Sequence, residues 1–301
     1  MDPLIIGLVA FSAILHVAWN VRLKTAGDPL RTATVGMLAA AVGIIPVGIL
    51  VWIADGRHEL PVDGIALGIA SGAIEAGYFV LLAAAYRRGD LSVVYPLARG
   101  TAPLIAVAIG VLILGERLGV AGSLGVIALL AGFLWLQRPW KIVAAVMAAP
   151  SGSRRGAIDT SILFALGIGV TSATYTAIDR VGTRLIAPFS YAAILWFVTC
   201  VCLVLWVTLV AGGGIFSGGR EENRRAAVGG WLTLGAYLCI LVALSVAPLS
   251  GVAPLRESAT VLAAAWGSVK LGEAADRGEV TRRVGSSVLI VTGAILLAIG
   301  G

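Results

Sequence analysis

The chain has few charged residues. Only 13% of its 301 residues are Asp, Glu, Lys or Arg, whereas a soluble domain carries roughly 25%. Hydrophobic residues make up 59% of the chain, and its mean hydropathy is +0.98. This shortage of charge excludes an ordinary water-soluble domain and predicts a protein that lies in a lipid bilayer.

The motifs of common enzymes and metal sites are also missing. The sequence contains only two histidines, His16 and His58, and no His-Glu-x-x-His, Gly-x-Ser-x-Gly or phosphate-binding loop. Its three cysteines, Cys200, Cys202 and Cys239, lie in apolar runs without disulfide or zinc spacing. We therefore expect no enzyme, no catalytic residue, no cofactor and no metal.

Basic residues do not gather into a stripe. The net charge is +6, but the Lys and Arg residues stand singly or in pairs in short gaps between apolar runs, where a membrane protein needs its anchors. Nucleic acid is therefore excluded as a partner. The first apolar run has neither a basic leader nor a small-residue cleavage site, so we expect no cleavable signal peptide.

Long apolar runs are what the chain has in abundance. A membrane-spanning helix needs about 20 mostly apolar residues, and alternation every second residue, typical of a membrane β-barrel, is absent. The sequence predicts an all-α integral membrane protein with ten transmembrane helices, at 3–20, 32–54, 64–86, 91–114, 118–137, 160–179, 188–211, 226–247, 250–271 and 282–300.

The third run carries small residues at a spacing of four: Gly64, Gly68, Gly72 and Ala76. Such a ladder lets a neighbouring helix backbone approach closely. We interpret it as a packing surface.

The chain contains an internal repeat. "YPLARGTAPLIAVAIGVLILGE" and "VAPLRESATVLAAAWGSVKLGE" each place an arginine 17 positions before the Glu of Leu-Gly-Glu, from Arg99 to Glu116 and from Arg256 to Glu273. At an offset of 159 residues, Tyr78 aligns with Tyr237, Pro29 with Pro188 and Asn20 with Asp179. The chain is thus expected to hold two copies of about 150 residues each.

Five spans per copy make the second copy enter the membrane from the opposite side. We expect two inverted five-helix repeats, at 1–138 and 160–301, joined by a linker at 139–159. Inverted repeats are typical of secondary transporters, with the substrate site near the midplane at the repeat interface. Duplication for stability alone is the alternative.

The motifs that carry this repeat also indicate a family. "YRRGDLSVVYPLARGTAPL…LGERL", its weaker echo "VAPLRESA…LGE" and the early "HVAWN" resemble the EamA branch of the drug/metabolite transporter superfamily. The resemblance implies ten transmembrane helices, two EamA repeats and export or exchange of small metabolites such as amino acids. The second copy departs from the pattern, with Glu257 after the arginine and Ala274 after Gly-Glu.

Four ionisable residues lie well inside the expected spans: Glu75, Arg99, Arg256 and Glu257. A charge at the bilayer centre costs about 2.5 to 3.5 kcal/mol on insertion scales, so such residues usually face the bundle interior and mark a substrate or proton pathway. A guanidinium can bind a carboxylate through two hydrogen bonds. The alternative is a structural ion pair, Arg99 or Arg256 with Glu75, that locks helices together.

We therefore predict substrate binding by these four charged residues and by aromatic residues that are expected to line the same cavity: Tyr78, Tyr95 and Tyr237. Glu75 and His16 are candidates for proton coupling, although a lone histidine is more often satisfied locally. Gly115-Glu116 and Gly272-Glu273 are expected to be structural turns, with glycine ending one helix and glutamate facing the dipole of the next.

The sequence thus favours a metabolite transporter in the bacterial cytoplasmic (inner) membrane. Its partners are the lipid bilayer, a small-molecule substrate and, as a candidate coupling ion, the proton. A channel and a membrane-embedded enzyme are the alternatives. The charges and the family resemblance disagree on the orientation in the membrane. Of the Lys and Arg residues, 16 follow odd-numbered spans and four follow even-numbered ones, which favours termini outside the cytoplasm. The family resemblance implies cytoplasmic termini.

Overall fold

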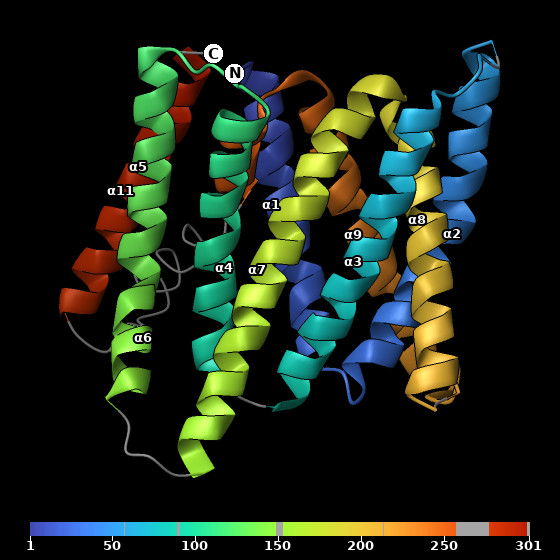
Figure 1. The fold of residues 1–301 in the computed structure, drawn as a ribbon, viewed down its shortest axis with the longest axis horizontal. Coiled ribbons are helices and arrows are strands. Elements are labelled where there is room, and N and C mark those ends of the chain that lie inside the picture. The colour runs from blue at the N-terminus through green and yellow to red at the C-terminus, as the bar shows by residue number, and fades with distance from the viewer. Residues whose placement is uncertain (57, 89–90, 149–152, 213, 257–276, 300–301) are drawn as a thin grey trace. The chain divides into compact units, whose positions relative to one another are not determined.

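The computed structural model describes residues 1–56, 58–88, 91–148, 153–212, 214–256 and 277–299. These residues form helices and connecting turns, with no strand among them. Figure 1 shows the helices as long rods. In chain order they are α1 (Pro3–Lys24), α2 (Pro29–Ala54), α3 (Val62–Arg88), α4 (Leu91–Ala108) with the π-helix η1 (Ile109–Ile113), α5 (Val120–Gln137), α6 (Pro139–Met147), α7 (Ser153–Leu185), α8 (Pro188–Leu205) with the π-helix η2 (Trp206–Val210), α9 (Gly219–Val246) and α11 (Arg277–Ile299).

Seven helices of the described chain are long and apolar enough to cross a membrane, namely α1, α2, α3, α5, the α8–η2 pair, α9 and α11. They coincide with seven of the ten expected spans. The expected span at 91–114 is helical through α4 and η1, and that at 250–271 is helical over 249–256, beyond which it lies outside the described residues. The all-helical class is confirmed, and the number ten stays a prediction.

One expected span had the wrong boundary. The span predicted at 160–179 ends at Asp179, next to Arg180. Helix α7 instead continues to Leu185, so both residues lie inside it. Side chains of other helices donate hydrogen bonds to Asp179, and a backbone carbonyl of α9 accepts one from Arg180.

The described chain divides into two compact units that interleave along the sequence. Unit 1 consists of 1–13, 90–170 and 247–301, and unit 2 of 14–89 and 171–246. Each unit therefore draws on both halves of the sequence. Helices α2 and α3 join α8 and α9 in unit 2, whereas α5 joins α11 in unit 1.

Close glycine contacts hold unit 2 together. A Cβ added at Gly64 or Gly68 would meet the side chains of Ile186 and Ile194 at 2.8 and 3.0 Å, and one at Gly72 would lie 2.6 Å from the Leu195 carbonyl oxygen. The small-residue ladder of α3 therefore faces α8 and the turn before it, which confirms it as a packing surface.

Unit 1 shows a reciprocal contact between α5 and α11. A Cβ at Gly125 would lie 2.8 Å from the Gly293 carbonyl oxygen, and a Cβ at Gly293 would lie 2.7 Å from that of Gly125. The Met1 ammonium also donates a hydrogen bond to the Leu297 carbonyl oxygen at 2.6 Å. Both ends of the described chain therefore lie at one end of unit 1 (Figure 1).

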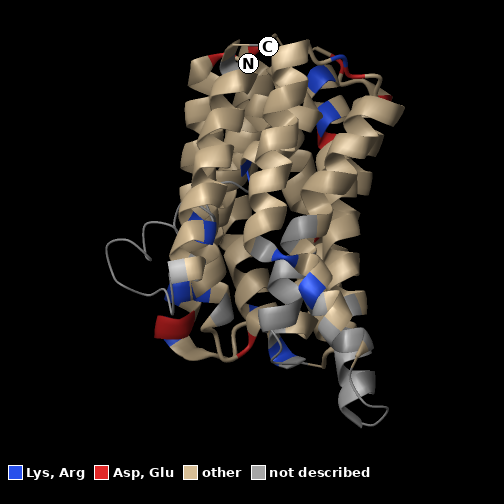
Figure 2. Ribbon diagram, turned by 90° about the vertical axis from the view of Figure 1, so that its left-hand side faces the viewer, with Lys and Arg blue, Asp and Glu red and all other residues tan. Residues whose placement is uncertain are grey.

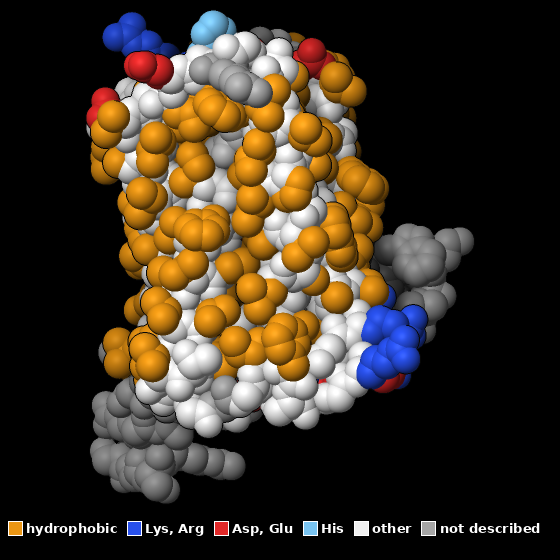
Figure 3. Space-filling view, turned by 90° about the vertical axis from the view of Figure 1, so that its right-hand side faces the viewer, with side chains coloured by type: hydrophobic (Ala, Val, Ile, Leu, Met, Phe, Trp, Pro, Cys, Tyr) orange, Lys and Arg blue, Asp and Glu red, His pale blue; other side chains and the backbone are white. Residues whose placement is uncertain are grey.

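The outer surface is apolar along the middle of the helices. Figure 3 shows a face covered with hydrophobic side chains, with charged ones at its two ends, and Figure 2 shows Lys, Arg, Asp and Glu gathered mainly towards helix ends. On α2, Val42 is 75% exposed and Leu50 63% exposed. Exposed apolar surface of this extent fits contact with lipid.

Candidate functional site

A buried carboxylate, Asp179, lies at the centre of the polar interior of unit 2. Its side chain is wholly buried. Oδ1 accepts hydrogen bonds from the Ser71 hydroxyl at 2.5 Å and the Tyr191 hydroxyl at 2.8 Å, and Oδ2 accepts one from the Tyr237 hydroxyl. These donors come from α3, α8 and α9, so one carboxylate of α7 joins four helices.

Glu75 is a second buried carboxylate of unit 2, only 3% exposed. The Thr199 hydroxyl of α8 lies 3.1 Å from its Oε2 and also 3.1 Å from the Gly72 carbonyl oxygen. Glu75 therefore lies at the α3–α8 crossing that the glycine ladder brings together. Two acidic groups within one apolar helix bundle are costly, since desolvation penalises the ionised form.

Aromatic rings connect opposite parts of the interior of unit 2. Successive centroids lie 6.0 Å apart from Trp19 to Phe79, 5.3 Å from Phe79 to Tyr78, 5.8 Å from Tyr78 to Tyr175 and 5.7 Å from Tyr175 to Tyr237. These rings come from α1, α3, α7 and α9 and are all buried. They therefore line the interior of the bundle and are not anchors at the membrane surface.

The predicted proton-relay candidate, His16, is 5% exposed. Its Nδ1 accepts a hydrogen bond from the Trp19 indole at 3.2 Å, and the Asn20 amide donates to the His16 carbonyl oxygen at 3.0 Å. Local contacts thus hold the histidine, and its role in proton coupling stays a prediction.

Arg180, next to Asp179 in sequence, donates a hydrogen bond to the Leu244 carbonyl oxygen of α9 at 2.5 Å.

The predicted arginines belong to unit 1. Arg256 is buried, with 8% of its surface exposed. Arg99 and Tyr95 are helical residues of α4 whose side chains are outside what the structure describes. Glu257, Gly272 and Glu273 also lie outside the described residues. Recognition of substrate by these residues stays a prediction.

Glu116 follows Gly115, whose φ of +63° favours glycine. Its carboxylate accepts hydrogen bonds from the Leu249 amide at 2.6 Å and from the Ser250 amide at 2.9 Å. We expected Glu116 to face the dipole of the following helix, but α5 begins without a side-chain cap. The carboxylate instead meets the first amides of helix 249–256, which belongs to the other half of the sequence.

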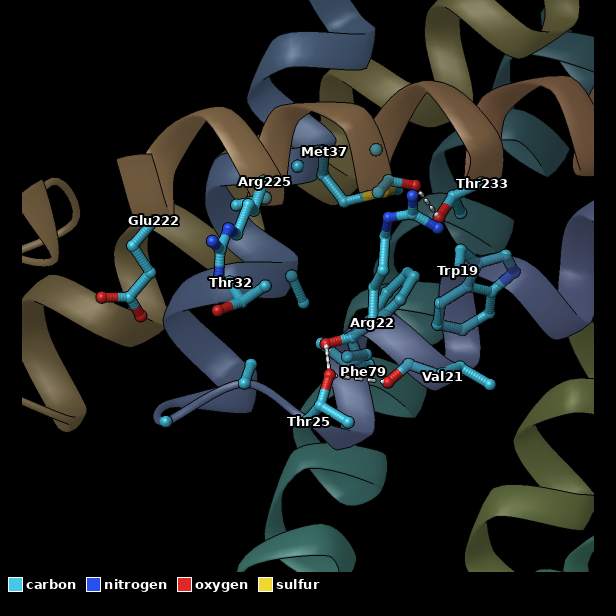
Figure 4. A pocket seen from close by; sticks show the side chains of 18 residues that line it. Trp19, Val21, Arg22, Thr25, Thr32, Met37, Phe79, Glu222, Arg225 and Thr233 are labelled. Carbon is cyan, nitrogen blue, oxygen red and sulfur yellow. Dashed lines mark hydrogen bonds between the residues drawn. The ribbon is translucent and has the colours of Figure 1, made fainter. Parts of the chain in front are cut away.

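Unit 2 also contains an open cavity of about 610 Å³, between α1, α2, α3 and α9 (Figure 4). Its floor consists of buried residues and its rim of exposed ones. The floor includes Trp19, Leu23, Gly36, Met37, Phe79, Gly230 and Thr233, and the rim includes Val21, Arg22, Thr25, Gly27 and Arg225.

Sequence reasoning missed Asp179 as a site residue. It was placed at a helix end and noted only as the counterpart of Asn20. Two signals could have identified it: the aligned Asn20 lies in the middle of "HVAWNVRLK", and Tyr237 lies at the matching position of Tyr78. A polar residue at one position of both copies suggests an interior location. Its three donors, however, are 12 to 108 residues away in sequence.

These features define a class of protein. Several of the apolar helices can span a bilayer. The interior of unit 2 holds buried carboxylates and a row of aromatic rings, and unit 1 holds the buried Arg256. Such features are expected for a multi-pass membrane protein that handles small molecules. Residues 2–137 match the model of the EamA-like transporter family. The match confirms, for this segment, the resemblance that its motifs predicted.

A solved structure shares the fold of the whole chain. One crystal structure, titled only "Crystal structure of protein", superposes with a TM-score of 0.69 at 19% sequence identity, covering 99% of this chain and 98% of that one. At this identity the likeness concerns the fold alone. A search of curated proteins found no match.

Proposed function

We propose that the chain is a secondary transporter that exports or exchanges a small polar metabolite, amino-acid-like or otherwise carboxylate-bearing, by alternating access. The observation that carries the proposal is the pair of buried carboxylates, Glu75 and Asp179, inside an apolar helix bundle. The match of residues 2–137 to a family of transporters supports it. Ionisable groups within a membrane bundle are retained mainly where function needs them. We assign the activity to the cytoplasmic membrane of a bacterium.

Inverted repeats form part of this proposal. Under the 159-residue offset, α2 corresponds to α8 and α3 to α9. Helix α2 packs against α9 and α3 packs against α8, so the two contacts exchange under the offset. These contacts support a pseudo-two-fold relation between the halves, which alternating access uses.

Within this mechanism, Glu75 is the proton-coupling group and Asp179 positions the helices. An ionised Asp179 needs donors from α3, α8 and α9, so it holds these helices in one arrangement. Glu75 lies beside Thr199 at the α3–α8 crossing, where a change of its charge alters that contact. In unit 1, Arg256 and Arg99 remain candidates for recognising a carboxylate. In unit 2, Tyr78 and Tyr237 are the candidates for aromatic lining.

The test is flux into proteoliposomes. A dye inside the vesicles reports proton movement while amino acids and other carboxylates are added one at a time, with and without an imposed pH gradient. We expect saturable, gradient-driven flux for wild type and its loss in Glu75→Gln. Glu59→Gln, an exposed carboxylate between α2 and α3, is the matched control and should transport normally.

Each outcome has one interpretation. Proton-driven flux at the wild-type level in Glu75→Gln would remove this residue from the mechanism. Flux that does not saturate would favour a channel. Absence of flux for the whole panel, with protein correctly inserted, would favour a membrane-embedded enzyme over a transporter.

A further inference from the structure

The cavity of unit 2 has a filled counterpart in the same unit. At the 159-residue offset, Thr32 corresponds to Tyr191, Gly36 to Leu195 and Gly230 to Ser71. The cavity is lined by Thr32, Gly36 and Gly230 at the α2–α9 crossing. Their counterparts lie at the α8–α3 crossing, so the two places can be compared residue by residue.

Large side chains occupy the counterpart. Tyr191 is wholly buried, its hydroxyl reaches Asp179, and its ring packs so closely on α7 that a Cβ at Gly182 would lie 2.2 Å from it. At the α2–α9 crossing Thr32 takes the place of this tyrosine, and Gly230 takes the place of Ser71, the serine that also binds Asp179. The space that the ring would fill is therefore left open as the cavity.

The cavity presents an apolar floor below a basic rim. Trp19, Met37 and Phe79 on the floor are buried. At the rim, Arg225 pairs with Glu221 at 3.0 Å, and the carboxylate of Glu222 pairs with the buried Arg31. Each of these charged side chains therefore has a partner of opposite charge.

Arg22 is different from the other rim charges. In the described part of the chain no carboxylate pairs with it, and its one hydrogen bond, to the Ala18 carbonyl oxygen of its own helix, is long at 3.5 Å. Figure 4 shows its side chain extending from α1 towards Thr233 of α9. A guanidinium has five N–H donors in a planar fork, so most of them are available to a ligand.

We propose that this cavity binds an amphipathic organic anion, with its carboxylate or phosphate on Arg22 and its apolar body against Trp19, Met37 and Phe79. A guanidinium fork matches either anion through two parallel hydrogen bonds. A mostly apolar pocket with one placed charge is the usual construction of a small-molecule site. Such a ligand reaches the cavity from the aqueous phase as a metabolite or from the bilayer as an anionic lipid. The proposal concerns binding and holds whether or not the chain moves this ligand.

The test uses the full chain purified in an uncharged detergent. The aqueous probe is 4-phenylbutyrate, and its neutral analogue is 4-phenylbutanol. A ligand that binds only the folded state raises the unfolding midpoint as its concentration increases. The lipid probe is phosphatidylglycerol, whose retention is compared with that of phosphatidylcholine by native mass spectrometry.

Three variants define the site. Arg22→Gln removes the charge, Thr32→Tyr installs the residue that fills the counterpart, and Arg224→Gln removes an arginine of the same end of α9 that does not line the cavity. We expect wild type and Arg224→Gln to bind at least one of the two anionic probes in preference to its neutral or zwitterionic analogue. Arg22→Gln should bind about tenfold more weakly or worse, since a hydrogen bond to a charged group is lost, and Thr32→Tyr should not bind.

Preference for phenylbutyrate identifies an aqueous ligand, and preference for phosphatidylglycerol a lipid. Equal binding of the charged and uncharged probes, binding of neither anion, or unchanged affinity in Arg22→Gln would overturn the proposal. Should Thr32→Tyr fail to fold, the comparison of Arg22→Gln with Arg224→Gln decides alone.

Discussion

Among single residues, Asp28 has three partners at the start of α2. Its carboxylate accepts hydrogen bonds from the Leu30 and Arg31 amides at 3.1 and 3.2 Å, and Arg87 lies 2.6 Å away. Partial burial raises the pKa of Asp28, but the hydrogen bonds from Arg87 and the two amides, with the charge of Arg87, outweigh it and hold the pKa below its ordinary value. The carboxylate thus favours the folded state when ionised.

We predict that Asp28→Ala lowers the free energy of unfolding by about 1 kcal/mol, the usual cost of a lost helix cap. Asp28→Asn should lose less, because asparagine also caps and the ion pair with Arg87 is largely exposed and screened. Since the folded-state pKa is lowered, the contribution is present above about pH 4 and disappears as the pH falls through the folded-state value. Denaturant unfolding in detergent at pH 7 and pH 3 measures this, and equal loss for both variants would argue against capping.

Asp179 is the residue on which most of the polar interior depends. Tyr191→Phe keeps the ring against Gly182 but removes one donor from a buried carboxylate. We predict a destabilisation of about 1 to 3 kcal/mol, since an undersatisfied buried charge is costly. In an Asp179→Asn background the same change should cost less, and a double-mutant cycle of unfolding free energies measures the difference. Strict additivity would mean that the hydroxyl and the carboxylate do not interact in solution.

At the scale of helices, backbone contact through glycine sets the position of α9 against α2. A Cβ at Gly230 would lie 1.9 Å from the Gly36 carbonyl oxygen, whereas a Cβ at its neighbour Gly229 would meet nothing within 4 Å. The two adjacent glycines therefore form a matched pair of test and control.

We predict that Gly230→Ala destabilises the protein by about 1 to 3 kcal/mol, the usual range for overpacking, because the clash is with backbone and cannot be relieved by a rotamer change. Gly229→Ala should be neutral or stabilising by up to about 1 kcal/mol, the difference in helix propensity. Thermal unfolding in detergent compares them. Equal behaviour of the two variants would show that α2 and α9 do not approach as closely as described.

For the whole molecule, the open question is which side of the membrane each end faces. Of the 20 Lys and Arg outside Arg99 and Arg256, 16 follow odd-numbered spans. Among the described side chains of this count, two are buried. Arg31 follows an odd-numbered span, and Arg180, which lies within α7, follows an even-numbered one. Their removal leaves the bias essentially unchanged.

The charge bias predicts that both termini lie outside the cytoplasm, because moving one positive charge against a potential of about 100 mV costs roughly 2.3 kcal/mol. The family resemblance implies the reverse. We expect a C-terminal fusion to a reporter active only in the periplasm to give signal, and a fusion to one active only in the cytoplasm to give none. Signal from the cytoplasmic reporter alone would show that orientation follows the family and not the charge count.

The sequence by itself predicted the all-helical class, seven of the membrane-spanning helices and the family that residues 2–137 match. These depend on local composition and on motifs such as "YPLARG", which lie within one chain segment. It also predicted the burial of Glu75, since a charge inside an apolar run has to avoid lipid. Only the tertiary structure decided that Asp179 joins α3, α8 and α9 and that Glu116 accepts hydrogen bonds from the amides of Leu249 and Ser250. It also decided that a cavity lies open at Thr32, whereas Tyr191 fills the corresponding place in the other half. Each of these features depends on contacts between helices that are far apart in sequence and on the sizes of the side chains that meet there. The pattern of a single segment contains no information on either.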